Sequence, residues 1–125
     1  METASFPIEV PLELRLTLQP LGKTSAGTTL IRADGWWRAM RTPQGPATLH
    51  LRRPTPGRLE ARGWGSGAEW ALRSVPGLVG LLDRPEALVT DHPVVGPLQR
   101  RFPGLRLPRT GLVFEVLLPT IVAQK

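Results

Sequence analysis

The spacing of the apolar residues changes once along this chain, at Ser66-Gly67, and this change limits the folds that it can adopt. Before that point, apolar and polar residues alternate in several short runs, which is typical of half-buried strands. After it, apolar residues recur every three or four positions, as on one face of a helix. Strands followed by helices indicate an α+β fold rather than alternating βα units.

Four or five short strands are expected before the change. Residues 11–18 form the most regular run, in which Leu12, Leu14, Leu16 and Leu18 alternate with Glu13, Arg15 and Thr17. Further strand candidates are residues 30–31, 36–41, 47–52 and 58–62, separated by turn signals such as Asp34-Gly35 and Thr42-Pro43-Gln44-Gly45. These short connections predict a meandering antiparallel sheet with one wet face.

Two details of this sheet follow from the alternation of side chains across a strand. In the run 47–52, Ala47, Leu49 and Leu51 are expected in the core, and Thr48, His50 and Arg52 in solvent. The adjacent Trp36 and Trp37 must point to opposite faces, so at least one belongs to the core. The other can cover a sheet edge, pack under a helix, or stack on unpaired bases.

Three helices are expected after the change. The first covers residues 68–75, with Ser66 as candidate cap, and Pro76-Gly77 ends or bends it. We interpret the turn at residues 75–80 as a helix break, because its second glycine comes one residue too late for the DNA-binding turn of a helix-hairpin-helix module.

The second helix is expected to begin at Asp91 as cap and to end at Pro103-Gly104, with an apolar side made of Val94, Val95, Leu98 and Phe102. The third runs from Leu112, with Thr110 as candidate cap and Pro119 as a kink. Its apolar stripe consists of Phe114, Leu117, Leu118, Ile121 and Val122. We expect this stripe to be covered by partners that the 125 residues do not include.

No catalytic residue is assigned, because the residues that such chemistry needs are scarce. The histidines, His50 and His92, stand alone, and we interpret both as surface residues or local hydrogen-bonding groups. Asp83, Glu86 and Asp91 fit helix-terminal charges better than a catalytic pair. There is no cysteine, no glycine-rich phosphate loop and no metal-spaced cluster, so no metal and no small-molecule cofactor are expected.

The net charge of +6 is concentrated in two blocks. Residues 35–65 sum to +5 and residues 100–125 to +4, while residues 1–34 sum to −1 and residues 66–99 to −2. Clustered cations suit a phosphate backbone. Arginine outnumbers lysine 14 to 2, a bias that a GC-rich genome produces without selection for binding, so the charge leaves both interpretations open.

The chain resembles one known family at residues 92–95, 101–108, 114–115 and 121–125, which read H-P-V-V, R-F-P-G-L-R-L-P, F-E and I-V-A-Q-K. This series is similar to the opening of the helical core in the AlkA-like 3-methyladenine DNA glycosylase II family of helix-hairpin-helix glycosylases. There a P-G-L-R-L-P connector leads to a helix containing F-E and ending in I-x-x-Q. A strand with paired aromatics before an arginine, as at Trp36-Trp37-Arg38, also resembles the family's N-terminal sheet domain.

The resemblance implies a sheet-and-helix domain at residues 1–90 and the opening helices of an incomplete all-α domain at residues 91–125. It implies a base-excision enzyme that hydrolyses the N-glycosidic bond of an alkylated base flipped out of double-stranded DNA. The DNA-gripping hairpin and the aspartate that stabilises the oxocarbenium-like transition state would lie outside this chain, which we expect to be inactive alone and monomeric when complete.

Site residues follow from the same resemblance and from the basic connector. Gln124 and Lys125 match the positions where the family inserts a wedge into the gap left by the flipped nucleotide, although lysine departs from the usual apolar or amide wedge. Candidate phosphate contacts are Arg100, Arg101, Arg106 and Arg109, whose alternative role is to solvate the connector.

Two other functions remain open at this point. The chain can be a small stand-alone DNA-binding module, or a structural domain whose exposed stripe binds hydrophobic dyes. The N-terminus carries an acid where a secretory signal needs a base, and no apolar run approaches a membrane span. We therefore expect neither export nor insertion, and a cytoplasmic location.

Overall fold

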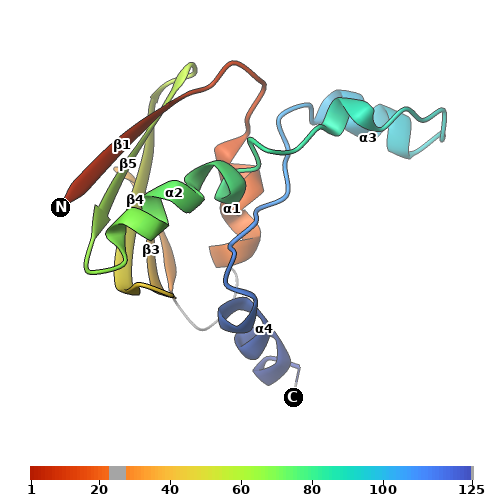
Figure 1. The fold of residues 1–125 in the computed structure, drawn as a ribbon. Helices are drawn as coiled ribbons and strands as arrows, with labels where there is room; N and C mark the ends of the chain where they lie inside the picture. The colour runs from red at the N-terminus through yellow and green to blue at the C-terminus, as the bar shows by residue number, and fades with distance from the viewer. Residues whose placement is uncertain (23–27, 125) are drawn as a thin grey trace.

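An antiparallel sheet with helices on one face forms the larger part of the molecule (Figure 1). The computed structural model describes residues 1–22 and 28–124. Within them the sheet has five strands in the order β1-β5-β4-β3-β2, which are β1 (Glu2–Pro7), β2 (Thr29–Arg32), β3 (Gly35–Thr42), β4 (Gly45–Thr55) and β5 (Arg58–Trp64). The helices are α1 (Leu14–Gly22), α2 (Ala68–Leu78), α3 (Val95–Arg101) and α4 (Val113–Val122), with a 3-10 turn at Pro85–Ala87. The predicted α+β class is confirmed.

The meander β2-β3-β4-β5 follows the predicted strands and turns. Trp36 pairs with Leu51 and Trp37 with His50 between β3 and β4, and Leu51 pairs with Ala61 between β4 and β5. The β3–β4 turn closes at Gly45, whose φ of 120° favours glycine, and the Thr42 hydroxyl donates to the Gly45 carbonyl at 2.8 Å. Local turn chemistry therefore sets the register of these strands.

The strand predicted at residues 11–18 is wrong, because residues 14–18 belong to helix α1 and residues 11–13 form neither strand nor helix. Its covered positions are Leu14, Thr17, Leu18 and Leu21, which is helical spacing, whereas Leu16 remains 37% exposed. The leucine alternation concealed this pattern because Thr17, a polar residue, is fully buried. The fifth strand is instead β1, which pairs with β5 in antiparallel register from Glu2–Gly63 to Pro7–Arg58.

The core lies between the inner face of the sheet and helices α1 and α2. Leu49 and Leu59 from the sheet and Val75 from α2 have no exposed surface, and Trp36 is 7% exposed. Helix α2 continues through Pro76 and ends at Leu78. The Gly80 N–H donates to Gly77 O and the Leu81 N–H to Pro76 O, and Gly80 has a φ of 74°. The predicted helix break in this turn is therefore a glycine-based helix end.

Several predicted side-chain positions and caps are corrected by the structure. His50 is 4% exposed rather than solvated, because the Trp37 ring stacks on it with centroids 4.1 Å apart. Ser66 does not cap α2, which begins after Gly67 without a side-chain bond. Asp91 does not cap α3; the His92 Nδ1 accepts from the Val94 and Val95 amides at 3.2 and 3.3 Å instead.

The third predicted cap is also displaced. The Thr110 hydroxyl accepts a hydrogen bond from the Leu112 amide at 3.2 Å, one position before α4, and α4 has Leu112 at its N-terminus. Pro119 lies inside α4. No helix in the described part of the chain is long and apolar enough to cross a membrane.

Candidate nucleic-acid interface

The basic residues at the end of α3 are exposed to solvent. Arg100 and Arg101 occupy the last turn of α3, where cations interact favourably with the helix dipole, and both are exposed. The Arg101 guanidinium lies 5.5 Å from the centroid of the Phe102 ring. On the same helix, the Gln99 amide donates to the carbonyls of Pro85 and Leu88 at 3.0 and 2.8 Å, which ties α3 to the preceding turn.

Arg106 lies inside the molecule and organises the connector between α3 and α4. It is 6% exposed, and its guanidinium donates to the carbonyls of Pro11, Gly80 and Asp83 at 3.1 to 3.2 Å. Its amide donates to the buried Thr17 hydroxyl at 3.2 Å. These bonds join the connector to the start of α1 and the end of α2, so the Arg106 side chain is committed to backbone acceptors rather than facing solvent.

Asp83 is the second anchor of the connector. Its carboxylate accepts from the Leu107 amide at 3.0 Å and from the Arg109 guanidinium at 2.9 Å. The Arg109 side chain is still 61% exposed and keeps its remaining N–H donors toward solvent. Arg106 and Arg109 are thus brought together over Asp83, which the sequence only suggested to be a helix-terminal charge.

An ion pair connects α4 to the sheet. The Glu115 carboxylate lies 3.7 Å from the Arg38 guanidinium, which also donates to the Thr29 hydroxyl at 2.9 Å. Burial is the main cause of two opposed shifts: it raises the pKa of Glu115 and lowers the pKa of Arg38, while the attraction between them partly offsets both. Sequence reasoning missed this pair, because its partners are 77 positions apart and carry no local signal.

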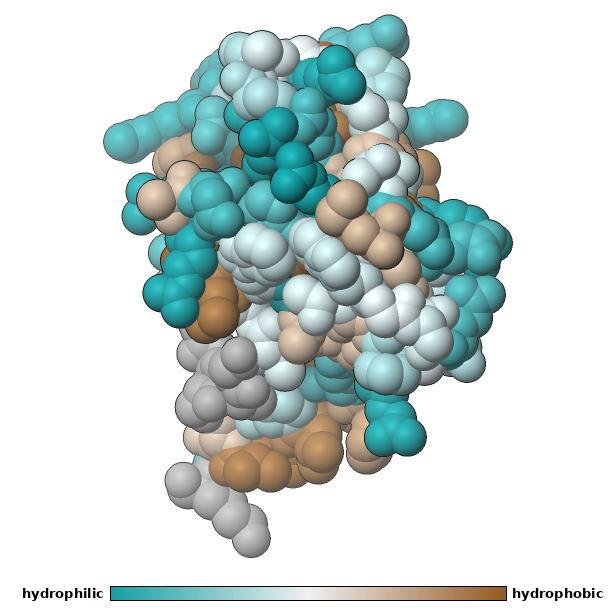
Figure 2. Space-filling view, turned by 90° about the vertical axis from the view of Figure 1, so that its left-hand side faces the viewer, coloured by the Kyte–Doolittle hydropathy of each residue, from teal (hydrophilic) through white to brown (hydrophobic). Residues whose placement is uncertain are grey.

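The apolar stripe of α4 is exposed over the described residues. Phe114 is 75% exposed, and the other members range from 48% to 66% for Leu117, Leu118, Ile121 and Val122. Figure 2 shows hydrophobic side chains at the lower end of the molecule, at the height of α4 in Figure 1. The apolar side of α3 is exposed as well, from 37% at Phe102 to 59% at Val94.

The sequence-predicted site residues therefore fall into separate places. Arg100 and Arg101 lie on α3, Arg106 and Arg109 on the connector, and exposed Gln124 just after α4. Figure 1 shows α3 and the end of α4 at opposite ends of the C-terminal segment. Lys125 is outside the described residues. Among those residues there is also no group of three or more His, Asp or Glu side chains placed to hold a metal ion.

The fold is similar to that of a 3-methyladenine DNA-glycosylase from Archaeoglobus fulgidus. The TM-score is 0.67 at 18% sequence identity, and the match covers 90% of this chain and 41% of that protein. The chain thus spans less than half the length of this structural neighbour and has a DNA glycosylase-like fold. No protein-family model and no curated protein sequence matches the chain.

Proposed function

We propose that this chain is the sheet-and-helix portion of a base-excision-repair DNA glycosylase, of the AlkA-like branch, that removes alkylated bases from double-stranded DNA. The observation that carries the proposal is the structural match, which includes nine-tenths of this chain but only 41% of a glycosylase. The motif series at residues 92–125 supports the same family. The helix-hairpin-helix and the aspartate that supports N-glycosidic bond cleavage would then come from outside residues 1–125.

The C-terminal segment supports this division of labour. Helices α3 and α4 expose apolar sides that further helices of such an enzyme would cover. Residues 1–90 would form the supporting domain, and residues 91–125 the first helices of the catalytic one. In this arrangement Gln124 and Lys125 would reach the gap beside a flipped nucleotide, and Arg100, Arg101 and Arg109 would contact phosphates. Arg106, whose guanidinium is bonded internally, would hold the connector in place.

Binding of the 125-residue chain to a labelled DNA duplex at low ionic strength tests the DNA contacts. We expect the Arg100→Gln/Arg101→Gln double variant to bind more weakly and to reduce the salt slope by about 2, at roughly 0.9 per phosphate contact. The matched control is Arg15→Gln/Arg73→Gln, which removes the same charge from two exposed arginines on α1 and α2. Equal losses of duplex affinity in both double variants would show that binding depends only on the net charge of the chain.

A base-release assay and the coding sequence test the enzymatic part. On methylated DNA we expect no excision by the 125-residue chain, and robust turnover would show that the catalytic group lies within it. A coding sequence that continues past Lys125 into a helix-hairpin-helix and a following aspartate would support the proposal. A stop codon after Lys125, together with salt-dependent duplex binding, would instead identify a stand-alone DNA-binding module.

A further inference from the structure

The outer face of the sheet, opposite α1 and α2, carries side chains that the proposed glycosylase function does not use. The strand register places Trp37, His50 and Arg62 side by side on this face, and next to them Ala39, Thr48 and Trp64. Figure 2 views the molecule from the side of the sheet and shows pale side chains of intermediate hydropathy in the middle, with hydrophilic ones above them and at both sides. In the described residues no helix covers this region.

The aromatic residues of the outer face form a fixed stack. The Trp37 ring stacks on His50 at 4.1 Å and on Trp64 at 5.5 Å, with interplanar angles of 19° and 22°. Asp34 holds two members of the stack, since its carboxylate accepts from the Trp37 indole N–H at 3.1 Å and its backbone carbonyl lies 3.1 Å from the His50 Nε2. Trp64 is half-buried, so part of its ring is accessible, and its stacking on Trp37 holds the ring in place.

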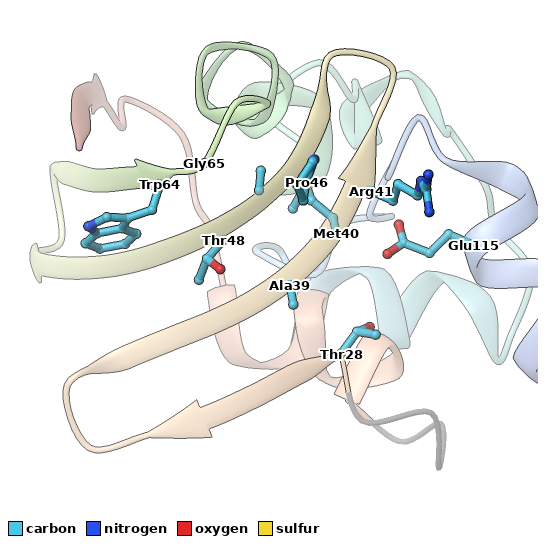
Figure 3. A pocket seen from close by; sticks show the side chains of 10 residues that line it. Thr28, Ala39, Met40, Arg41, Pro46, Thr48, Trp64, Gly65 and Glu115 are labelled. Carbon is cyan, nitrogen blue, oxygen red and sulfur yellow. The ribbon is translucent and has the colours of Figure 1, made fainter.

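A shallow hollow of about 450 Å³ lies beside Trp64. Figure 3 shows Trp64 at one end of it, Arg41 and Glu115 at the other, and the small side chains of Ala39 and Thr48 between them. An indole wall next to a floor of small side chains leaves room for a flat ring to lie against Trp64. A guanidinium at the far end suits an anionic group attached to that ring.

The charges around the hollow favour an anion. Arg41 is exposed and Arg62 half-buried, and neither forms an ion pair with a residue in the described parts of the chain. The acids nearby are compensated: Glu60 lies 2.6 Å from Arg52 and 3.6 Å from Arg58, and Glu115 lies 3.7 Å from Arg38. The two arginines thus remain as positive charge on the outer face, Arg41 at the hollow and Arg62 next to His50 in the strand register.

We propose that the outer face of the sheet binds single-stranded nucleic acid, with an unpaired base stacked on Trp64 in the hollow and the backbone phosphates on Arg41 and Arg62. Aromatic platforms flanked by cations are how proteins hold single strands without reading sequence. A duplex fits poorly, because its bases are stacked on one another and do not offer a free ring face. This site is separate from the proposed duplex contacts on α3 and the connector, and it does not depend on them.

Fluorescence anisotropy of a labelled oligothymidylate of about 12 nucleotides tests the site, using the full 125-residue chain. We expect affinity that falls with salt, with a logarithmic slope near −0.7 per phosphate contact. Trp64→Leu keeps an apolar side chain but removes the ring, and should weaken binding by about tenfold or more, whereas Trp64→Phe should retain most of it. Arg41→Gln should weaken binding and lower the salt slope by about 0.7.

Two further variants separate binding from folding. Ala39→Leu fills the floor of the hollow at an exposed position and should also weaken binding, even if Trp64→Leu is poorly folded. Trp70→Leu makes the same substitution on α2, away from the outer face, and should leave oligonucleotide binding unchanged. Thermal unfolding of each variant tests whether the fold is retained.

Wild-type affinity in both Trp64→Leu and Ala39→Leu would overturn the proposal, as would the absence of salt-dependent binding by the unmodified chain. If the unmodified chain shows no salt-dependent binding, the outer face would instead be a contact surface for a protein partner or for a second copy of this chain. Failure of the duplex experiment on Arg100 and Arg101 leaves this result unaffected, because the two experiments use different ligands and different arginines.

Discussion

Residues 1–90 and residues 91–125 use their apolar side chains in opposite ways. In the described part of the chain, every buried hydrophobic residue lies between Ile8 and Val79, where the sheet and helices α1 and α2 enclose one another. Beyond Val79, the residues that form the apolar stripes of α3 and α4 are at least a third exposed, from 37% at Phe102 to 75% at Phe114. What attaches the second region to the first is mainly polar, through the internal bonds of Arg106, the carboxylate of Asp83 and the pair Arg38–Glu115.

This contrast shows that an amphipathic pattern specifies a helix without specifying what covers it. Helix α4 carries an apolar stripe, as α2 does, but α2 lies against β4, β5 and β1, whereas the ion pair of Glu115 with Arg38 joins α4 to the sheet. Stability should therefore be sensitive to substitutions in the first region and at the polar attachments, and insensitive to substitutions on α4.

The largest effect is expected from truncating a core leucine. Leu59 has no exposed surface, so Leu59→Ala should lower the free energy of unfolding by about 4 kcal/mol through lost burial and a cavity. Leu117→Ala, the same change at a position 49% exposed on α4, should cost less than about 0.5 kcal/mol. Urea unfolding measures both, and equal losses would mean that α4 is enclosed in solution.

The next effect concerns the attachment through Arg106. Arg106→Leu leaves the carbonyls of Pro11, Gly80 and Asp83 without their donor, and should cost about 3 kcal/mol. Arg109→Leu removes an exposed ion pair to Asp83 and should cost less than about 1 kcal/mol. If both variants unfold at the same denaturant concentration, the connector is not held by the buried arginine.

A smaller loss is expected at the end of α2. Gly80 has a φ of 74°, and a methyl group there would collide with the side chain of Arg106, so Gly80→Ala should cost about 2 kcal/mol. Gly57→Ala is the control, because a methyl group at Gly57 meets no atom within 4 Å. A thermal melt in which both variants behave alike would contradict the role assigned to Gly80.

The smallest effect is a dependence on pH at the junction between the regions. Because burial raises the pKa of Glu115, the folded protein holds this proton more tightly than the unfolded chain. The stability that Glu115 contributes should therefore decrease as the pH rises from the ordinary pKa of a glutamate to the raised pKa of Glu115. Relative to Glu115→Gln, wild type should be favoured more at acidic than at neutral pH, by less than about 1 kcal/mol because the side chain is 21% exposed and solvent screens it.

A control with the opposite sign is available in the sheet. The hydrogen bond from Arg52 is the main cause that lowers the pKa of Glu60, so the stability that Glu60 contributes should be lost as pH falls. Parallel pH profiles for Glu115→Gln and Glu60→Gln relative to wild type would show that at least one of the two environments does not act as described.

Much of the fold was predictable because it depends on local signals. Strands β2 to β5, helix α2 and the presence of α3 and α4 follow from side-chain spacing and turn residues. Helix α1 was mistaken for a strand, since one buried threonine broke the helical pattern and four leucines suggested alternation. Strand β1 was missed because it lies at the sheet edge, where only some of its side chains are covered.

The candidate site was less predictable than the fold. His50 was expected in solvent, and only the pairing of β3 with β4 shows that Trp37 covers it. The sequence marks Arg106 and Arg109 as equivalent cations on one connector, but one is buried under backbone acceptors and the other exposed. That distinction depends on atoms contributed by α1, by the end of α2 and by Asp83, which no local pattern relates.

The sequence by itself determined the period of each element, the turns between strands and the places where the charge is concentrated, because these depend on neighbours a few residues away. Only the tertiary structure decided which face of the sheet became the core, which arginines stay in solvent, and how the aromatic stack lies on the outer face. Those outcomes depend on contacts between residues tens of positions apart. Such contacts contribute to stability only after folding has closed the long loops between their partners.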